Sequence, residues 1–567
     1  MNIEDLHVAS TATIKEVLTV INEAPRKGAQ AGIALVVDAD KQLQGIVTDG
    51  DIRKGLISGA TLDSPIKDIM NAEPIVMSDA LSYPELVKGI EEELRSRGKE
   101  PQSGFNIRQV LLYHEHPKKV SDILNFYDIW RASEAKTRHV CIVGMGYVGL
   151  TLAATMADVG LKVTGTDISQ EIVDMLNQGN PPFHETGLQK VLERTLNRTL
   201  TIQSNMPEEA DVYIICVGTP VQPNNEPNLE HIKAASNAVG NVLKRGDVVI
   251  VRSTVPVGTC RSVVLPALQQ ASGMKAGMFH FASMPERTLE GKALQELREL
   301  PQIVGGYNKQ STDIAINIFR ELTPFIVSMD SLEEAEMAKL LNNVYRDATF
   351  GIVNEFALAC NSLNLSANKI IARANEGYPR GNMPQPSPGV GGYCLRKDPY
   401  LFMHSAKKAG FTPQIIPITR KTNESMPYYV SERVLAFCQE HGIPKEQMKV
   451  FLLGFAFKGR PETSDTRFST TLDILSHLKA AGITNVHGYD AVVDATELNE
   501  FGVKPTTPEE GFDGAHAVLF LNNHSSHSDL DIFRLAQKTE KPLLLFDGWG
   551  VSSEDIEKLP HVRFVPL

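Results

Sequence analysis

One cysteine lies in a setting that suits covalent chemistry. Cys394 follows a pair of glycines in "GVGGYCLRKDPY" (389–400), and Lys397 and Asp398 come shortly after it. A thiolate is a strong nucleophile, and a neighbouring lysine can lower the pKa of the thiol. Asp398 could cap the helix that "PYLF" begins. An inert thiol in a glycine-rich loop is the alternative for Cys394.

A second pair of polar residues lies on a predicted helix. From about residue 331 to 376 the apolar residues repeat with helical spacing, and Lys339 and Asn343 stand four residues apart in "KLLNN". Residues at this spacing share one face of a helix. The pair could therefore act on one ligand, and a solvated surface lysine is the alternative for Lys339.

A glycine loop precedes this helix in the chain. An apolar strand at 140–143 leads into "GMGYVG", an apolar helix follows, and the next strand ends in Asp167. This order is the fingerprint of a dinucleotide site, in which the helix N-terminus stabilises the pyrophosphate. An acid at Asp167 accepts from the ribose hydroxyls and repels a 2′-phosphate, which favours NAD over NADP.

Further strand patterns predict a parallel α/β sheet. The runs 211–220 and 247–259 end in Gly, Thr and Pro, and ligands lie at the C-terminal ends of such strands, so Thr219 and Thr254 should face the cofactor. The same rhythm returns near the end of the chain in "MKVFLLGFAFKG", "ITNVHGYDA", "AHAVLFLNN" and "KPLLLFDGW", which predicts a second nucleotide-binding-like domain. The candidate cofactor residues are Gly144, Gly146, Tyr147, Val148, Gly149, Asp167, Thr219 and Thr254.

The first part of the chain contains a weak internal repeat. "LQGIVTDGDIRK" (43–54) and "VSDILNFYDIWR" (120–131) share a strand followed by Asp-Ile at a helix start. The pattern resembles a CBS-domain pair, a module that often binds adenine nucleotides. The resemblance implies that Thr48, Asp51 and Asp128 contact the nucleotide, and helix capping is the alternative. A polar segment at 131–138 is the expected linker.

Composition limits the remaining possibilities. The chain has 567 residues, too many for one core, and its net charge of −12 argues against a nucleic-acid partner. The six cysteines show no CxxC pair, so we expect no disulfide framework, no metal site and a reducing cytoplasm. Neither a signal peptide nor a membrane span is expected.

From residue 139 onward the chain resembles the UDP-glucose/GDP-mannose dehydrogenase family. Its motifs arrive in the family's order: "GMGYVGL", "PFHETGL", "CVGTP", "RSTVPVGT", "PER" with "IVGG", "KLLNN", "GVGGYCLRKDP" and "GFAFKGRPETSDTR". The fold class implied is α/β, with two Rossmann-like domains joined by a central long helix and preceded by the small α/β CBS-like pair.

The resemblance also implies domain boundaries and an assembly. The expected domains are the CBS pair at 1–132, an NAD-binding Rossmann domain at 137–330, a helical region with the catalytic loop at 331–430, and a UDP-sugar-binding Rossmann-like domain at 440–567. A homodimer formed through the central helix, or a higher homo-oligomer, is the expected assembly.

The family's reaction is oxidation of a sugar C6 alcohol to a carboxylate with two NAD. The resemblance makes Cys394 the nucleophile that traps the aldehyde as a thiohemiacetal and then carries a thioester. It assigns the oxyanion contact to Lys339, a sugar contact to Asn343 and water activation to Asp398, with Thr254 and Glu286 holding that water. It implies that the substrate is bound by Glu286, Lys339, Asn343, Gly391, Lys458 and Arg467. Asp465 would orient Arg467, and Glu185 in "FHETGL" matches an acid of the substrate loop.

The branch of the family is indicated less directly. "PERTLEGKALQEL" and "QPSPGVGG" resemble enzymes of UDP-N-acetylhexosamines, whereas Tyr393 stands where that branch usually has His and Lys397 resembles the UDP-glucose branch. We therefore expect UDP-GlcNAc or UDP-ManNAc as substrate, then UDP-glucose, then GDP-mannose. The expected product is a uronate for surface polysaccharide. A catalytically silent NAD or nucleotide-sugar sensor and a single-hydride dehydrogenase of the hydroxyacid type are the alternatives from other classes.

Overall fold

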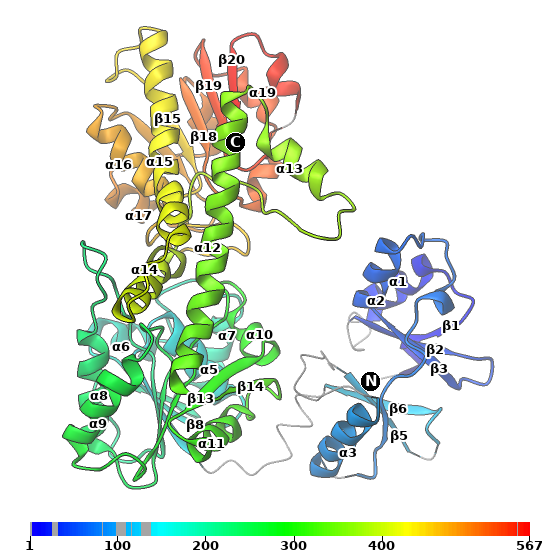
Figure 1. Ribbon diagram of the computed structural model, residues 1–567. Coiled ribbons are helices and arrows are strands. Elements are labelled where there is room, and N and C mark those ends of the chain that lie inside the picture. Colours follow the sequence, from blue (N-terminus) through cyan, green and yellow to red (C-terminus); the bar gives the residue numbers. More distant parts are fainter. Residues whose placement is uncertain are drawn as a thin grey trace. The chain divides into compact units, whose positions relative to one another are not determined.

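The computed structural model describes residues 3–24, 32–81, 83–97, 109–114, 116–125, 138–552 and 554–567. The chain divides into two compact units, one built mainly from the N-terminal residues and one containing most of the chain from residue 138 (Figure 1). Asp128 and residues 131–137 of the expected linker lie outside the described residues.

The N-terminal unit repeats one small α/β motif. Strand β1 pairs parallel with β2, and β2 pairs antiparallel with β3; β4, β5 and β6 repeat both relationships, with a register shift in each antiparallel pair. The strand part of the predicted repeat is thus present in two three-stranded sheets, and residues 126–131 of the second copy lie outside the described residues. The elements are β1 (His7–Ala9), α1 (Ile14–Glu23), β2 (Ile33–Val37), β3 (Leu43–Thr48), α2 (Asp49–Ile57), β4 (Val76–Ser78), α3 (Tyr83–Ser96), β5 (Gln109–Tyr113) and β6 (Val120–Asn125).

The two repeats share a hydrophobic core. Leu35 and Leu43 of the first sheet pack in one buried cluster with Leu111 and Ile123 of the second. Burial of such side chains stabilises the pair by roughly 1.5–3 kcal/mol each. The repeats therefore form one packed body, and their identity as CBS domains stays a prediction.

The first Rossmann-like domain has an eight-stranded sheet in the order β14-β13-β12-β11-β10-β7-β8-β9. The four strands expected from the sequence, β7, β8, β10 and β11, pair in parallel, whereas β13 runs antiparallel to β12, so the sheet is mixed. The elements are β7 (His139–Val143), α5 (Tyr147–Asp158), β8 (Lys162–Thr166), α6 (Gln170–Asn177), α7 (Leu188–Thr195), β9 (Leu200–Gln203), β10 (Val212–Ile215), α8 (Glu230–Val242), β11 (Val248–Val251), α9 (Leu265–Ser272), β12 (His280–Ser283), α10 (Ala293–Glu299), β13 (Gln302–Gly306), α11 (Lys309–Phe319) and β14 (Ile326–Met329).

A 31-residue helix, α12 (Leu332–Ser362), connects the two Rossmann-like sheets and packs along α15 (Ile415–Glu440) (Figure 1). Ser331 caps its N-terminus by accepting from the Glu334 amide. Gly351 lets the two helices approach closely, because a Cβ there would lie 2.6 Å from the Thr419 carbonyl oxygen. Two further helices, α13 (Ala367–Asn375) and α14 (Tyr393–Lys408), lie between α12 and α15 in the chain.

The second Rossmann-like domain has six parallel strands in the order β17-β16-β15-β18-β19-β20. Its core continues into the helices, since Val353 of α12 and Val430 of α15 join the cluster that holds Val450 and Leu452. In the described part of the chain, no helix combines the length and the apolar character needed to cross a bilayer. The elements are β15 (Val450–Leu453), α16 (Thr470–Ala480), β16 (Val486–Tyr489), α17 (Ala495–Glu500), β17 (Lys504–Pro505), α18 (Pro508–Phe512), β18 (Ala517–Phe520), α19 (Ile532–Ala536), β19 (Leu543–Asp547) and β20 (Val562–Pro566).

Candidate active site

The glycine loop joins β7 to α5 as the sequence predicts. Gly144 has φ of +98°, which only glycine adopts readily, and a Cβ on Gly149 would lie 1.7 Å from the Gly144 carbonyl oxygen. Gly146 caps α5, and a Cβ there would meet no atom within 4 Å. Open space at the N-terminus of a helix fits a pyrophosphate. Val148 lies half-buried in the first turn of α5.

Asp167 holds the glycine loop through the backbone amide of Met145. It follows β8, and its carboxylate accepts from the backbone amides of Met145 at 2.7 Å and Ser169 at 2.9 Å. The half-buried carboxylate keeps lone pairs for ribose hydroxyls, which suits NAD. The loop and the acid together therefore fit a dinucleotide.

Thr219 and Thr254 lie at neighbouring strand ends, but only one remains partly open. Thr219 is buried and donates its hydroxyl to the backbone carbonyl of Thr254. The Thr219 hydroxyl thus links the loops after β10 and β11, and the contact of both side chains with the cofactor stays a prediction. Thr254 stays half-buried.

The glycine-rich loop ends at Gly392, because α14 begins at Tyr393. Cys394 is therefore the second residue of this helix. Gly392 caps that helix with φ of +86°. Asp398 lies inside α14, which makes the helix-cap alternative wrong. Dipoles at a helix N-terminus favour a thiolate.

Four polar groups gather around Cys394 from two helices. Asn343 of α12 donates to Asp398 Oδ2 at 2.6 Å, and Lys397 donates to Asp398 Oδ1 at 2.7 Å. Lys339 is buried on the same side of α12 as Asn343, which makes the solvated-lysine alternative wrong. The positive charges of Lys339 and Lys397 both act on the Cys394 thiol.

The thiol itself is exposed to solvent, although protein atoms crowd around it. Burial raises the pKa of Cys394, and Lys339 is the strongest opposing charge, ahead of Lys397. Lys397 lowers the thiol pKa, as predicted, but burial outweighs this effect and the net pKa of Cys394 is raised. Water around the exposed thiol moderates the effect of burial.

Glu286 is buried and heavily bonded. Its carboxylate accepts from the Arg252 guanidinium at 2.6 and 3.0 Å and from the amides of Arg287 at 2.6 Å and Thr288 at 2.8 Å. Although burial opposes it, the net pKa of Glu286 is lowered, with Arg252 as the largest of the lowering interactions. Lys339 adds to this lowering, which places Glu286 within the electrostatic reach of the site.

Glu185 connects the substrate loop to the glycine loop. It is buried, it accepts from the Tyr147 hydroxyl, and it accepts from the amides of Gly291 at 2.6 Å and Ala293 at 2.8 Å. Both carboxylate oxygens are therefore used by protein groups. Glu185 therefore ties the glycine loop to the segment before α10.

The second Rossmann-like domain contributes cations to the same region. Lys458 donates to the Glu290 carbonyl at 2.6 Å, and Arg467 forms the expected pair with Asp465 at 2.6 Å. Glu290 Oε1 lies 3.8 Å from Arg467. Burial raises the pKa of Glu290 and lowers the pKa of Lys458, while each charge partly offsets the other shift. Glu290 was not predicted as a site residue.

Glycines after residue 388 serve the packing between domains. A Cβ on Gly391 would lie 3.0 Å from the Phe468 carbonyl oxygen, and one on Gly392 would lie 2.7 Å from the Phe457 ring. Protein packing therefore already requires glycine at both positions, and the substrate contact expected for Gly391 stays a prediction. Tyr393 lies beside this contact, with Lys397 and Arg467 each over its ring.

In the N-terminal unit, Thr48 and Asp51 form a capping box at the start of α2. Thr48 donates from its amide and hydroxyl to Asp51 Oδ2 at 2.9 and 2.7 Å, and its hydroxyl accepts from the Asp51 amide. The capping alternative is therefore present for this pair, whether or not a nucleotide binds.

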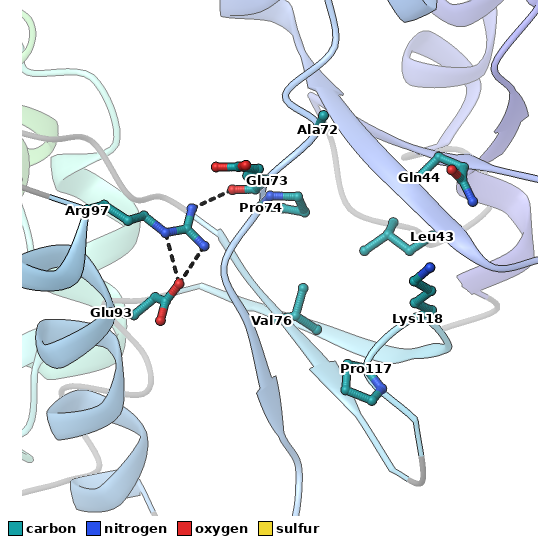
Figure 2. A pocket seen from close by; sticks show the side chains of 10 residues that line it. All are labelled: Leu43, Gln44, Ala72, Glu73, Pro74, Val76, Glu93, Arg97, Pro117 and Lys118. Atoms are coloured by element: carbon teal, nitrogen blue, oxygen red, sulfur yellow. Dashed lines mark hydrogen bonds and ion pairs between the residues drawn. The ribbon is translucent and has the colours of Figure 1, made fainter.

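A pocket of about 520 Å³ lies where the two repeats meet, away from Thr48 and Asp51, neither of which lines it (Figure 2). Leu43 and Val76 provide apolar walls. Figure 2 shows Arg97 turned toward Glu93, with hydrogen bonds of 2.7 and 2.9 Å, so its charge is already paired.

Sequence reasoning missed a buried polar group behind Cys394. Asp347 of α12 pairs with Arg420 of α15 at 2.5 Å, and Arg420 also donates to the Leu395 carbonyl at 3.1 Å. The spacing of Lys339, Asn343 and Asp347 at every fourth residue was the available signal, because it places all three on one helix face.

Models of three domains of the UDP-glucose/GDP-mannose dehydrogenase family match this chain. The NAD binding domain matches residues 138–323, the central domain matches residues 333–425, and the UDP binding domain matches residues 451–554. All three matches lie C-terminal to the two repeats of the N-terminal unit.

Individual relatives match over most of their length. A UDP-N-acetyl-D-mannosamine dehydrogenase of Campylobacter jejuni is 32% identical over 396 residues, which are 68% of this chain and 95% of the relative. The structure of a UDP-D-ManNAc dehydrogenase of Pyrococcus horikoshii has a TM-score of 0.68 at 27% identity, covering 75% of this chain and 99% of its own. A UDP-N-acetyl-mannosamine dehydrogenase of Staphylococcus aureus has a TM-score of 0.65 at 30% identity, covering 76% and 98%.

Proposed function

Because the chain belongs to the UDP-glucose/GDP-mannose dehydrogenase family and is an NAD-dependent nucleotide-sugar dehydrogenase, we propose that it oxidises the C6 alcohol of a UDP-N-acetylhexosamine to the carboxylate. The observation that carries the proposal is the position of Cys394 in the first turn of α14, where the charge of Lys339 acts on the thiol and Asn343 bonds to Asp398. A reactive thiol is needed only when oxidation passes beyond the aldehyde.

NAD supplies the hydride acceptor for both oxidations. In the first, the C6 alcohol loses a hydride and a proton and becomes an aldehyde. The ammonium group of Lys339 stabilises the oxyanion that develops at C6, because it is buried where water cannot screen its charge. Asn343, oriented by Asp398, contacts the sugar.

In the second stage, the Cys394 thiolate adds to the aldehyde carbon and gives a thiohemiacetal. Loss of a second hydride and a proton from this species leaves a thioester. Water then adds to the thioester, the C–S bond breaks, and the carboxylate and the thiol are released. Asp398 takes a proton from that water in this proposal.

The favoured substrate is UDP-N-acetylmannosamine, with UDP-N-acetylglucosamine second. Support comes from the names of the relatives in Campylobacter jejuni, Pyrococcus horikoshii and Staphylococcus aureus. Tyr393 and Lys397 remain the residues that resemble other branches, but UDP-glucose is not favoured by the comparisons. The product would be a uronate for a surface polysaccharide. A silent sensor is not favoured either.

The decisive experiment is the NADH yield at completion, with excess NAD and a limiting amount of each UDP-sugar in turn. About two NADH per sugar, from one substrate far faster than from the others, supports the thioester route. A yield of about one NADH per sugar means that oxidation stops at the carbonyl, which contradicts the role given to Cys394.

Three further assignments stay proposals. The domain boundaries at 1–132, 137–330, 331–430 and 440–567 are one, and a homodimer through α12 is another. The third is an adenine nucleotide at the N-terminal repeats that changes the rate through a coupling between two sites. Titration of AMP, ADP and ATP against the rate tests this regulation, and a flat response to all three contradicts it.

A further inference from the structure

Helix α14 contains a proline where a hydrogen bond is missing. Pro399 has no amide hydrogen, so it cannot donate to the carbonyl four residues earlier, which belongs to Leu395. Leu395 directly follows Cys394. The first turn of α14 is therefore weakened at the residue beside the thiol, and its free carbonyl needs another donor.

Arg420 of α15 supplies that donor. Its Nη1 lies 3.1 Å from the Leu395 carbonyl oxygen and 2.5 Å from Asp347 Oδ1 of α12. The side chains of Arg420 and Asp347 are 2% and 1% exposed, so water does not compete for these bonds. The guanidinium thus joins the long helix α12 to the backbone beside Cys394.

The same polar group also holds the other end of the glycine loop. Asn423 donates to Asp347 Oδ1 at 2.9 Å and accepts from Asn354 at 2.9 Å. Asn354 in turn accepts from the backbone amide of Ser387 at 2.9 Å. A continuous path of hydrogen bonds therefore runs from the Leu395 carbonyl to the Ser387 amide and brackets residues 387–395.

Stability alone does not explain a buried ion pair of this kind. The free energy needed to remove two charges from water is often as large as the free energy of their attraction. A buried ion pair is therefore weak support for a purely stabilising role. Asp347 stands four residues after Asn343 and eight after Lys339, on the helix face that points at the site. The Asp347–Arg420 pair can instead fix the distance between this face of α12 and the Cys394 thiol.

We propose that Asp347 and Arg420 are positioning residues for Cys394: they replace the hydrogen bond that Pro399 removes and fix the thiol against Lys339 and Asn343. The inference rests on the proposed function only in naming Cys394 as the nucleophile. A displacement of about 1 Å at a reacting atom can lower a rate about 100-fold. The loss should therefore appear in kcat, with little change in the KM for NAD.

The experiment compares Asp347→Asn, Arg420→Gln and the double variant in the full-length protein. Three quantities are measured: kcat, the KM for NAD, and the pH profile of Cys394 alkylation by iodoacetamide. We expect kcat to fall by about 100-fold, and the double variant to lose no more than the worse single variant, because the two residues act as one unit. The alkylation profile should shift in all three. Asp158→Asn, which breaks an ion pair of 2.6 Å with Arg298 at the C-terminal end of α5, is the matched control and should leave kcat and the profile unchanged.

A rescue separates positioning from general stability. Adding Pro399→Ala to the double variant returns an amide that can bond to the Leu395 carbonyl, so kcat and the alkylation profile should recover by several-fold without Arg420. A wild-type alkylation profile in the double variant, or losses that follow only the melting temperature and do not respond to Pro399→Ala, overturns the proposal.

Failure of the proposed function looks different. If Cys394 is not the nucleophile, the Cys394→Ala variant should still form the acid. The alkylation profile needs no substrate, so in the Asp347 and Arg420 variants it would still report whether these two residues position the thiol.

Discussion

Asn343 donates a hydrogen bond of 2.6 Å to Asp398, and this contact joins α12 to α14 directly behind the Cys394 thiol. Both residues are buried, and the other oxygen of Asp398 accepts from Lys397. Each oxygen of the carboxylate is thus bonded to a protein group. The contact raises a specific question about Asp398: whether it takes a proton from water or only orients Asn343 and Lys397.

Asp398→Asn distinguishes these roles. If Asp398 is the base for thioester hydrolysis, its loss should slow that step by roughly 10²–10⁴-fold. Two NADH per active site should then appear in a rapid burst, followed by a slow steady state, and mass spectrometry should detect the acylated protein. If Asp398 only orients its neighbours, the burst itself should slow and no acylated protein should accumulate. Asp247→Asn, at a buried carboxylate before β11, is the control and should behave as the native protein does.

Lys339→Met should affect the thiol and the chemistry together. Lys339 is the strongest charge opposing the upward shift in the pKa of Cys394, so its removal should raise that pKa further. In the proposed mechanism the same lysine stabilises the oxyanion, and loss of such a group lowers kcat by roughly 10²–10³-fold. Iodoacetamide kinetics against pH report the first effect, and steady-state NADH formation reports the second.

The exposed Lys309 on α11 provides the control for charge removal, since it pairs only locally with Asp313. Lys309→Met should change neither quantity. An alkylation profile that stays unchanged in Lys339→Met would contradict the electrostatic contact between Lys339 and Cys394.

Asp167→Ser should weaken NAD and relax the discrimination against NADP. The carboxylate holds the glycine loop through the Met145 amide and is placed to accept from the ribose. A hydrogen bond to a charged group contributes roughly 1.5–3 kcal/mol, so the Kd for NAD should rise about 10- to 100-fold. Titration of both cofactors by NADH or NADPH fluorescence measures the change. Equal Kd values for NAD in the variant and the native protein would exclude this role.

Local patterns predicted the parts of the site that depend on neighbours in sequence. The loop from Gly144 to Gly149 and the acid at Asp167 were found because strand, turn and helix follow one another within a short segment. The start of α14 was misplaced for a local reason too. Gly392 and Pro399 both interrupt helical patterns, yet Gly392 caps the helix and Pro399 lies within it.

Contacts between distant segments could not be predicted in this way. Arg420 and Asp347 are 73 residues apart, and Glu185 meets the Gly291 amide 106 residues away. Nothing in a single sequence indicates which buried arginine meets which acid. Thr219 shows the same limit on a smaller scale, because its hydroxyl donates to the Thr254 carbonyl, 35 residues away in the loop after β11.

Tyr345→Glu should break the expected homodimer. Leu341, Tyr345, Ile352 and Phe356 of α12 are exposed apolar side chains at spacings of four and seven residues, with Tyr345 exposed by 74%. Such a stripe on one helix face favours a helix–helix interface. Light scattering should give twice the chain mass of 62.3 kDa for the native protein and a single chain mass for the variant. Lys309→Glu is the control, and a native protein that is already monomeric would contradict the interface.

Glu336 should make the stability of the fold depend on pH. It is buried on α12 and accepts from the amides of Gly258 at 2.5 Å and Cys260 at 2.7 Å, which tie the loop after β11 to that helix. Burial raises its pKa to about 7, above the ordinary value of 4.5, while the two amides oppose the shift. The folded state therefore binds the proton more tightly than the unfolded state.

The sign of the effect follows from that difference in proton binding. The contribution of Glu336 to stability is fully present below about pH 4.5 and is lost as the pH rises to about 7, at roughly 1.4 kcal/mol per pH unit. Urea unfolding of the native protein and of Glu336→Gln across this pH range isolates the contribution of Glu336 to the unfolding free energy. All other groups titrate equally in the two proteins, so their effects cancel in the difference. The difference in unfolding free energy should shift against the native protein as the pH rises. A difference that is constant between pH 5 and pH 7 would mean that Glu336 is already charged at pH 5 and that the two amides outweigh its burial.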